Sequence, residues 1–194
     1  MKFKKIEKKK QKIRILFRKY RKNLTNDQKK IEEKNIIKKI IKHKLIQSSK
    51  NIGCFMSFDG EIPTNNLIRI LKKNIYLPSI NPYNQLYFLK YNKKITFKKN
   101  IFNIKEIPYN KGKIISIKKL DVVFVPIVAF DKRGYRLGMG GGFYDKLLLN
   151  WKEKNFYPIG LTYDFSFIEK LPTTAWDIPL PEIITPTNIW SWKY

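Results

Sequence analysis

Residues 121–146 read DVVFVPIVAFDKRGYRLGMGGGFYDK, and this stretch decides the fold. Its first ten residues are mostly apolar on both faces of an extended chain, which is typical of a central strand in a parallel sheet. Four glycines then fall within residues 138–142, and the pattern FYDKLLLNW at 143–151 predicts a helix. A strand, a glycine loop and a helix in this order indicate an α/β domain whose ligands bind past the carboxyl ends of the strands.

The rest of the chain alternates between helical and extended patterns. Apolar residues recur with helical spacing between positions 13 and 20, so we expect a first helix that ends near Asn23. Thr25 and Gln28 have the spacing of a capping box that opens a second helix. We expect strands at 51–58, 75–80, 85–92, 157–164 and 183–190, a helix at 64–73, and an irregular lysine-rich segment at 92–119. These elements predict one domain over residues 1–194, a three-layer α/β/α fold with a mainly parallel sheet.

The composition fits a folded protein in a reducing compartment. Hydrophobic residues make up 43% of the 194 residues, and no apolar run approaches the ~20 residues of a membrane helix. The basic N-terminus is not followed by an apolar block of signal-peptide length. Cys54, the single cysteine, cannot form an internal disulfide, and it lies in an apolar segment that predicts a core position. We therefore expect a cytoplasmic protein with no membrane partner.

The formal charge of +26 is unevenly distributed. Residues 1–50 hold 20 Lys/Arg and 4 Asp/Glu, whereas residues 121–194 hold eight of each. Lysine supplies 35 of the 41 basic residues and accompanies 29 Ile and 16 Asn, all with A/T-rich codons, so base composition accounts for much of the charge. We expect no nucleic-acid partner. The alternative is a basic RNA-binding or ribosome-associated protein on a nucleotide-binding α/β scaffold, and the N-terminal lysines favour it.

The glycine loop has the chemistry of a phosphate site. Glycines let backbone N–H groups approach a ligand closely, and the following helix presents free N–H groups and a partial positive charge. Arg136 can add a bidentate phosphate contact, and the Asp145 carboxylate suits Mg²⁺. The pattern matches neither GxxxxGK[ST] nor GxGxxG. A tight strand-to-helix connection with a solvated Asp145 is the alternative.

The run FDKRGYRLGMGGGFYDK at 130–146 resembles the signature of the 5-formyltetrahydrofolate cyclo-ligase (methenyltetrahydrofolate synthetase) family. Other family segments are resembled in the same order by Lys10 with Arg14, by MSFDGEIPT at 56–64 and by WDIPLPEIITP at 176–186. The resemblance spans roughly residues 10–190. It implies a three-layer α/β enzyme that uses ATP and Mg²⁺ to convert 5-formyltetrahydrofolate into 5,10-methenyltetrahydrofolate, with release of ADP and phosphate. We expect a monomer with this folate as its substrate.

The resemblance also implies roles for individual residues. The ATP-binding set would be Lys10, Arg14, Arg136, Leu137, Gly138, Met139, Gly140, Gly141, Gly142, Phe143 and Tyr144. The folate-binding set would be Met56, Glu61, Met139, Gly140, Gly141, Gly142 and Phe143. Arg136, Tyr144 and Asp145 would be catalytic, and Asp145 would bind Mg²⁺ with Asp177 as a second candidate. Met139 stands where many family members have Arg, and Arg14 with Arg18 is a rival to the pair Lys10 and Arg14.

The reaction explains these residue types. Transfer of a phosphoryl group to the formyl oxygen needs charge neutralisation and alignment more than a protein nucleophile. A carboxylate such as Glu61 suits the donor-rich edge of a pterin. We expect Asp59 to be a turn residue and His43 to lie on the surface. The aromatic residues between 83 and 91 are expected to pack in strands, with a stacking platform as the alternative: Tyr83, Tyr87, Phe88 and Tyr91.

Overall fold

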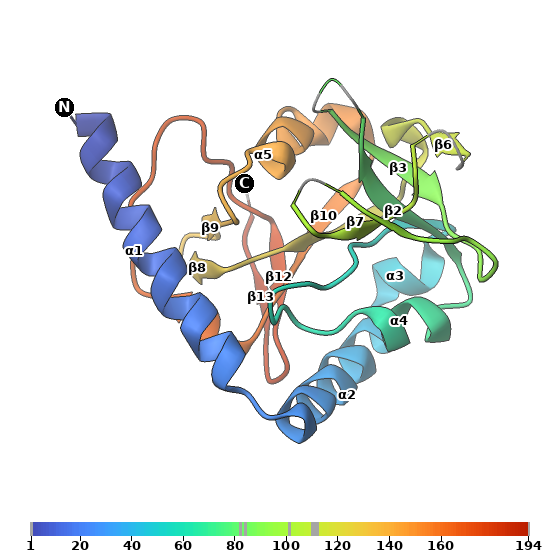
Figure 1. Cartoon of the computed structure of the whole chain (residues 1–194), viewed down its shortest axis with the longest axis horizontal. Helices are drawn as coiled ribbons and strands as arrows, with labels where there is room; N and C mark the ends of the chain where they lie inside the picture. Colours follow the sequence, from blue (N-terminus) through green and yellow to red (C-terminus); the bar gives the residue numbers. More distant parts are fainter. Residues whose placement is uncertain (1, 82, 84, 101, 110–112, 194) are drawn as a thin grey trace.

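A large mixed sheet forms the centre of the molecule, in a computed structural model that describes residues 2–81, 83, 85–100, 102–109 and 113–193 (Figure 1). Its eight strands lie in the order β13-β12-β10-β7-β1-β2-β3-β6. Neighbouring strands from β12 to β2 pair in parallel, and the pairs at both ends are antiparallel. The strands are β1 (Asn51–Gly53), β2 (Asn74–Ile80), β3 (Leu86–Lys90), β6 (Ile114–Ile115), β7 (Val122–Pro126), β10 (Tyr157–Leu161), β12 (Glu182–Ile184) and β13 (Ile189–Ser191).

The helices differ in length and in what they cover. They are α1 (Lys2–Asn23), α2 (Asn26–Lys42), α3 (Lys44–Ser48), α4 (Asn65–Ile70) and α5 (Phe143–Leu148). Short 3₁₀ turns occupy Ile117–Lys119, Trp151–Lys154 and Asp164–Ser166. The capping box before α2 is confirmed, since Gln28 N donates to Thr25 Oγ1 at 3.2 Å and Thr25 N donates to Gln28 Oε1 at 2.8 Å.

The two faces of the large sheet are buried in separate core clusters. Val122 and Phe124 belong to the cluster that also holds apolar residues of α2, α3 and α4, whereas Val123 and Val125 belong to the cluster that holds Leu148 of α5. This alternation is what the period of two along a strand requires when both faces are covered. Helix α1 instead contributes Phe17 to a third cluster, with residues of a smaller sheet.

The smaller sheet corrects the expectation of one long strand at 121–130. Strand β7 ends at Pro126, and the chain continues into β8 (Ala129–Asp131), which pairs with β11 (Phe167–Ile168) and β9 (Arg136–Leu137). The break has a physical cause at Ile127. Its carbonyl accepts hydrogen bonds from the side chains of Arg21 and Thr162, and therefore this residue does not continue the strand ladder.

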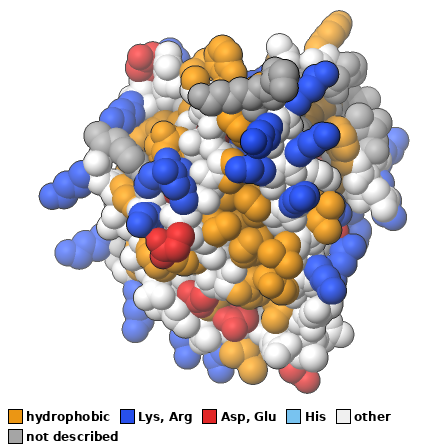
Figure 2. All heavy atoms as spheres, turned by 90° about the vertical axis from the view of Figure 1, so that its left-hand side faces the viewer, with side chains coloured by type: hydrophobic (Ala, Val, Ile, Leu, Met, Phe, Trp, Pro, Cys, Tyr) orange, Lys and Arg blue, Asp and Glu red, His pale blue; other side chains and the backbone are white. Residues whose placement is uncertain are grey.

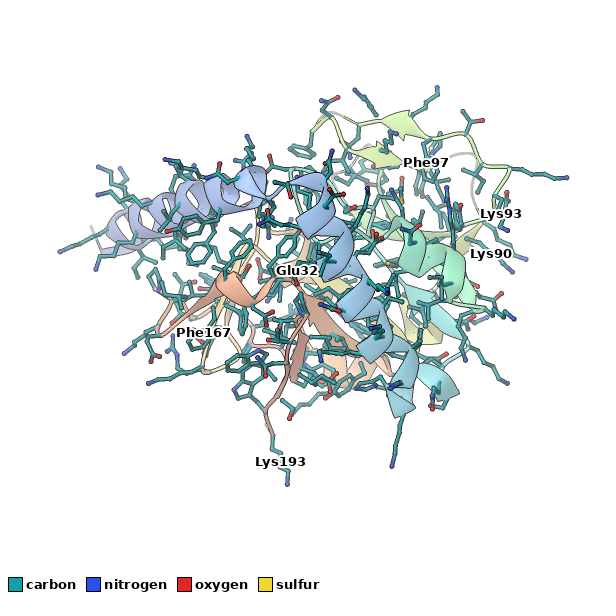
Figure 3. The ribbon with its side chains drawn as sticks, turned by 90° about the horizontal axis from the view of Figure 1, so that it is seen from below. Glu32, Lys90, Lys93, Phe97, Phe167 and Lys193 are labelled. Carbon is teal, nitrogen blue, oxygen red and sulfur yellow. The ribbon has the colours of Figure 1, made fainter. Side chains whose placement is uncertain are left out.

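Further predicted elements are shorter or divided. The strand expected at 51–58 covers only β1, because beyond it the Phe55 carbonyl accepts from the Thr64 hydroxyl. The strand expected at 183–190 is the antiparallel pair β12 and β13, since Thr185 N donates to the Asn188 carbonyl in the turn between them. The segment expected to be irregular contains β6 and the pair β4 (Lys98–Lys99) and β5 (Lys105–Glu106). In the view from below, Phe97 beside this pair and Phe167 of β11 lie at opposite ends of the molecule (Figure 3).

Candidate functional site

The glycine loop connects β9 to α5 and is shaped by two left-handed residues. Gly140 has a φ of +102°, and Gly142, which caps the N-terminus of α5, has a φ of +69°. Both φ angles are unfavourable for residues other than glycine. The loop follows the hairpin of β8 and β9 rather than the central strand itself, which corrects the simple strand–loop–helix expectation. Helix α5 is six residues long because Leu149 leaves the helical conformation and Asn150 is left-handed.

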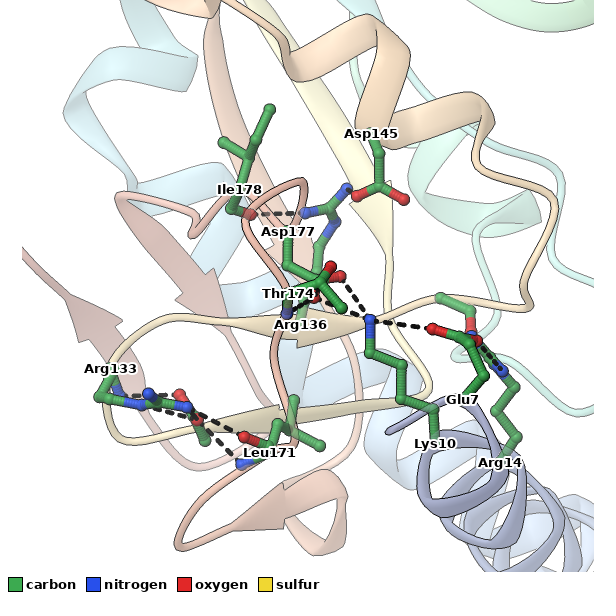
Figure 4. A network of polar contacts seen from close by, with 12 residues as sticks. Glu7, Lys10, Arg14, Arg133, Arg136, Asp145, Leu171, Thr174, Asp177 and Ile178 are labelled. Atoms are coloured by element: carbon green, nitrogen blue, oxygen red, sulfur yellow. Dashed lines mark hydrogen bonds and ion pairs between the residues drawn. The ribbon is translucent and has the colours of Figure 1, made fainter. Parts of the chain in front are cut away.

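A buried carboxylate fixes the hairpin that leads into the loop. Asp131 is fully buried, and its Oδ1 accepts from Arg133 N at 2.9 Å and from Tyr135 N at 3.2 Å. Its Oδ2 accepts from Leu171 N at 3.0 Å and from the Arg133 guanidinium (Figure 4). These bonds hold the hairpin turn, and consequently they fix where Arg136 begins β9.

Helix α1 lies across the glycine loop and presents two cations to it. Arg14 Nε donates to the Gly138 carbonyl at 2.9 Å, and a Cβ at Gly140 would lie 3.5 Å from Arg14 Cζ. Lys10 Nζ donates to both carboxylate oxygens of Asp177, at 2.8 and 2.7 Å (Figure 4). The structure thus brings Arg14 to the glycine loop and Lys10 to Asp177. The rival Arg18 points elsewhere, since its Nε lies 2.5 Å from Asp59 Oδ2.

Lys10 differs from the other lysines of its helix. Its exposed fraction is 6%, whereas neighbours on α1 are exposed: Lys4, Lys5, Lys8, Lys9 and Lys12. On the side of the molecule that carries α1, basic side chains surround an apolar strip (Figure 2). Lysine is buried only where it has a partner, so the position of the Lys10 side chain is fixed by its ion pair with Asp177. The exposed lysines are solvated.

Arg136 is held in a defined orientation. Its Nη1 donates to the Ile178 carbonyl at 2.6 Å and its Nη2 donates to Asp145 Oδ1 at 2.7 Å. Burial lowers the pKa of Arg136, and the neighbouring Asp145 opposes this. Two of the three residues predicted to be catalytic, Arg136 and Asp145, are therefore in contact. Met139 packs with the apolar residues of α1 and the smaller sheet.

The two metal candidates both face cations of the protein. Burial raises the pKa of Asp177, but hydrogen bonds from Lys10 and Thr174 outweigh this and bring it below its usual value. In the part of the chain that the structure describes, no three His, Cys, Asp or Glu side chains cluster as a ready-made metal site. Mg²⁺ commonly takes one or two carboxylates together with substrate phosphates, so Asp145 and Asp177 fit that mode of binding.

Glu61 lies in the loop after β1 and is 5% exposed. Phe58 N donates to its Oε2 at 3.2 Å. Burial raises the pKa of Glu61 to about 7, and Arg21 opposes the rise. The Tyr144 hydroxyl is buried and has no hydrogen-bond partner within the described part of the chain, and burial together with the charge of Glu61 raises the pKa of Tyr144. A residue predicted for folate binding and one predicted for catalysis therefore share one buried region. Met56 is partly buried against the core on the same side as α2.

A cavity of about 620 Å³ opens beside the glycine loop at Phe143. Tyr83, Tyr87 and Phe88 line it. Tyr83 is 83% exposed and lies outside the strands, so its predicted strand packing is wrong, whereas Phe88 is buried in β3 as expected. Phe102 meets Phe143 edge-on at 5.9 Å between ring centroids. Phe102 could not be predicted from sequence, since its segment lacks a clear periodic pattern.

Three further expectations can be compared with the structure. Cys54 is fully buried and Asp59 lies in a turn with a φ of 48°, so both predictions are confirmed. The surface position of His43 is wrong: its side chain is 16% exposed, and Nε2 lies 2.9 Å from Glu182 Oε1, because α2 ends against β12. Among the described helices, none is both long and apolar enough to cross a bilayer.

A glycine loop that meets cations of a separate helix on an α/β sheet is typical of enzymes that handle phosphate groups. Residues 6–186 match the model of the 5-formyltetrahydrofolate cyclo-ligase family, and the chain belongs to that family. The 5-formyltetrahydrofolate cyclo-ligase of Haemophilus influenzae is 44% identical over 91% of this chain and 97% of its own. The enzyme of that name from Escherichia coli is 36% identical over 91% of this chain and 100% of its own.

A solved structure agrees with the fold. The 5,10-methenyltetrahydrofolate synthetase of Aquifex aeolicus superimposes with a TM-score of 0.82 at 28% identity, covering 94% of this chain and 92% of its own. The α/β architecture with a large mixed sheet is therefore that of cyclo-ligases.

Proposed function

We propose that this protein converts 5-formyltetrahydrofolate into 5,10-methenyltetrahydrofolate at the expense of ATP, with Mg²⁺, and releases ADP and phosphate. The observation that carries the proposal is the contact between Arg14 and the Gly138 carbonyl, which joins a basic helix to the glycine loop across 124 residues of sequence. Family membership supports the same reaction. We further propose a three-layer arrangement in a single domain, a monomer and a cytoplasmic location.

The residues around the glycine loop would hold the phosphates of ATP. Bound ATP and Mg²⁺ would supply a transferable phosphoryl group and the charge that neutralises it. Lys10, Arg14 and Arg136 would contact phosphate oxygens, and the backbone of residues 138–142 can approach them because glycine carries no Cβ. Asp145 and Asp177 would hold the metal ion, each by exchanging the cation that now faces it. Such a site works by alignment and electrostatics.

The folate would lie between the glycine loop and the loop that carries Glu61. The ionised Glu61 carboxylate accepts hydrogen bonds, and the pterin offers an amine and a ring N–H on one edge. The cavity beside Phe143, with Tyr83 and Tyr87 on its wall, offers flat apolar surface for the remainder of the molecule. Its volume of about 620 Å³ is within the range of small-molecule sites.

The chemistry balances without a protein nucleophile. Phosphorylation of the formyl oxygen makes that oxygen a leaving group. Attack by folate N10 on the formyl carbon closes the ring, and N10 gives up its proton to solvent. The C–O bond breaks, and phosphate departs with the former formyl oxygen. Arg136 and the loop N–H groups would stabilise the negative charge that this oxygen carries away.

The direct test is turnover by the purified full chain. We expect methenyltetrahydrofolate absorbance to appear from 5-formyltetrahydrofolate only when ATP and Mg²⁺ are both present. Phosphate release in equal amount would establish the stoichiometry. Folded protein that forms no product under these conditions would overturn the proposal.

A further inference from the structure

Arg21, in the last turn of α1, is an arginine that the mechanism does not use. It is 1% exposed, which makes it one of the largest fully buried side chains in the described part of the chain. Its Nη2 donates to the Ile127 carbonyl, at the point where the chain passes from β7 towards β8. Its Nε and Nη1 are buried and have no hydrogen-bond partner among the residues that the structure describes. A buried guanidinium with two unpaired nitrogens is costly, so its position calls for a compensating anion.

The loop that carries Glu61 is packed directly against Arg21. Gly60 has a φ of +74°, and a Cβ there would lie 3.0 Å from Arg21 Cβ and 3.3 Å from the Arg21 carbonyl oxygen. One turn earlier on α1, Arg18 binds Asp59. The last turns of α1 therefore hold Asp59 and Gly60, the two residues that precede Glu61.

Glu61 is the anion that acts most strongly on the Arg21 guanidinium, and Arg21 is the cation that most favours the ionised form of Glu61. The two side chains form no direct ion pair. The negative charge of Asp59, in the same loop, opposes the ionisation of Glu61. The charge of Glu61 in turn raises the pKa of Tyr144 in α5 and of Tyr163 after β10. Among the described groups that act on Glu61, Arg21 is the cation that compensates a negative charge at this position, and the Phe58 N–H adds a hydrogen bond to the carboxylate.

We propose that Arg21 is a positioning residue that keeps Glu61 as an oriented carboxylate for the donor edge of the pterin. The inference rests on the proposed function and adds to it a group that does not touch the folate. Arg21 acts through Glu61 because its own free nitrogens are closed off from solvent. The uncharged acid would present a proton to the pterin N–H groups and would weaken binding.

The test is the pH dependence of 5-formyltetrahydrofolate binding to the full chain without ATP, measured by calorimetry from pH 5.5 to 9. We expect wild-type binding to strengthen as pH rises through about 7, where Glu61 ionises. Arg21→Met should move this midpoint up by about one unit, which leaves about a tenth rather than half of Glu61 ionised at pH 7. Binding would then be about fivefold weaker at pH 7 and close to wild type at pH 9.

Proton release gives a second readout that a purely structural role would not change. At pH 7 the wild type should release about half a proton per folate bound, and Arg21→Met close to one. Arg21→Lys, which keeps a cation, should restore most of the wild-type profile. Lys19→Met removes the same charge from an exposed residue of the same helix and should bind as the wild type does. If Arg21→Met does not fold, Arg21→Gln can keep a donor for the Ile127 carbonyl and removes the charge.

Each outcome is decisive. An Arg21 variant that binds folate with the wild-type midpoint and proton release overturns the positioning role and leaves the proposed function intact. If the variant binds folate more weakly by the same factor at every pH, the positioning role is also overturned, because such a loss indicates a general distortion of the site. Wild-type protein that binds no folate at any pH overturns the proposed function together with this inference.

Discussion

The ammonium group of Lys10 lies 2.8 and 2.7 Å from the two carboxylate oxygens of Asp177, and this pair joins α1 to the loop after β11. Thr174 donates to the same carboxylate from its backbone N at 2.6 Å and from its hydroxyl at 2.9 Å. Lys10, which we propose to bind phosphate, and Asp177, which we propose to bind the metal ion, thus neutralise each other's charge. Binding of Mg²⁺ and ATP would separate them and give each a new partner.

Lys10→Met should weaken both stability and ATP binding. Removing one partner of a largely buried pair costs several kcal/mol, and the Thr174 bonds reduce the cost here to about 2 kcal/mol. Urea unfolding measures this value, and the loss of a phosphate contact should weaken ATP binding about tenfold. The matched control is Lys9→Met, an exposed neighbour on α1. Equal unfolding free energies for the two variants would contradict the structural role of the pair.

Asp177→Asn should destabilise the protein in a pH-dependent way. The pKa of Asp177 is below its usual value of 3.8, so its stabilising contribution is present above pH ~4 and is lost as pH falls through the lowered pKa. The difference in unfolding free energy between wild type and variant should therefore shrink on acidification. A difference that stays constant down to pH 2 to 3, roughly, would show that the carboxylate charge is not responsible.

Glu61→Gln should stabilise the empty protein while it abolishes folate binding. The pKa of Glu61 is about 7 in the fold and 4.5 without it, so folding favours the protonated form. The contribution of Glu61 to the free energy of unfolding is therefore fully present below pH ~4.5. Between that pH and about pH 7 it decreases by about 3 kcal/mol. Glutamine resembles the protonated acid. Thermal unfolding should show a gain for the variant at pH 8 and none at pH 4.5, and an absent gain at pH 8 would contradict the burial of the charge.

Two glycines of the loop should respond differently to alanine. Gly140→Ala places a side chain at a φ of +102° and should cost about 1–3 kcal/mol, with a matching loss of ATP binding. Gly138→Ala is the control, since a Cβ there meets nothing within 4 Å and the backbone is not left-handed. Its unfolding free energy should stay within about 0.5 kcal/mol of the wild type. Similar losses in both variants would mean that loop conformation does not decide the effect.

Asp145→Asn tests the metal assignment. Thermal stabilisation by ATP should increase on addition of Mg²⁺ in the wild type and should lose that increase in the variant, because a neutral amide binds Mg²⁺ weakly. The variant also removes the anion beside Arg136, so its own unfolding midpoint serves as the baseline. Asp27→Asn, on an exposed residue paired with Lys30, controls for loss of one negative charge. Retention of the Mg²⁺ effect in Asp145→Asn would remove the residue from the site.

The local pattern predicted most of the parallel core, but not where strands end. The strand Val122–Pro126 could be predicted because a strand that is buried on both faces is apolar along its whole length. The turn at Ile127 could not be predicted, because the Ile127 carbonyl accepts a hydrogen bond from Arg21, which lies 106 positions earlier in the sequence. A side chain that ends a strand from such a distance leaves no periodic signal near the strand.

The same limit applies to the site. Lys10, Arg14 and the glycine loop could be named from sequence, since their segments resemble a family pattern. The structure brings Arg14 to the loop and Lys10 to Asp177. Their roles toward ATP and folate stay predictions. Arg21 could not be found, because one arginine among many basic residues has no distinguishing spacing. Its burial results from tertiary packing, with Gly60 of a distant loop lying against it.

Helix α1 packs with Val128, Ala129 and Leu137 rather than within the two clusters that cover the large sheet. Two of the three cations proposed for the phosphates, Lys10 and Arg14, therefore belong to a helix that packs outside the two clusters of the large sheet. An enzyme built this way lends itself to complementation in trans: a chain that lacks the first helix, mixed with a peptide of residues 2–23, would report their reassociation as recovered turnover.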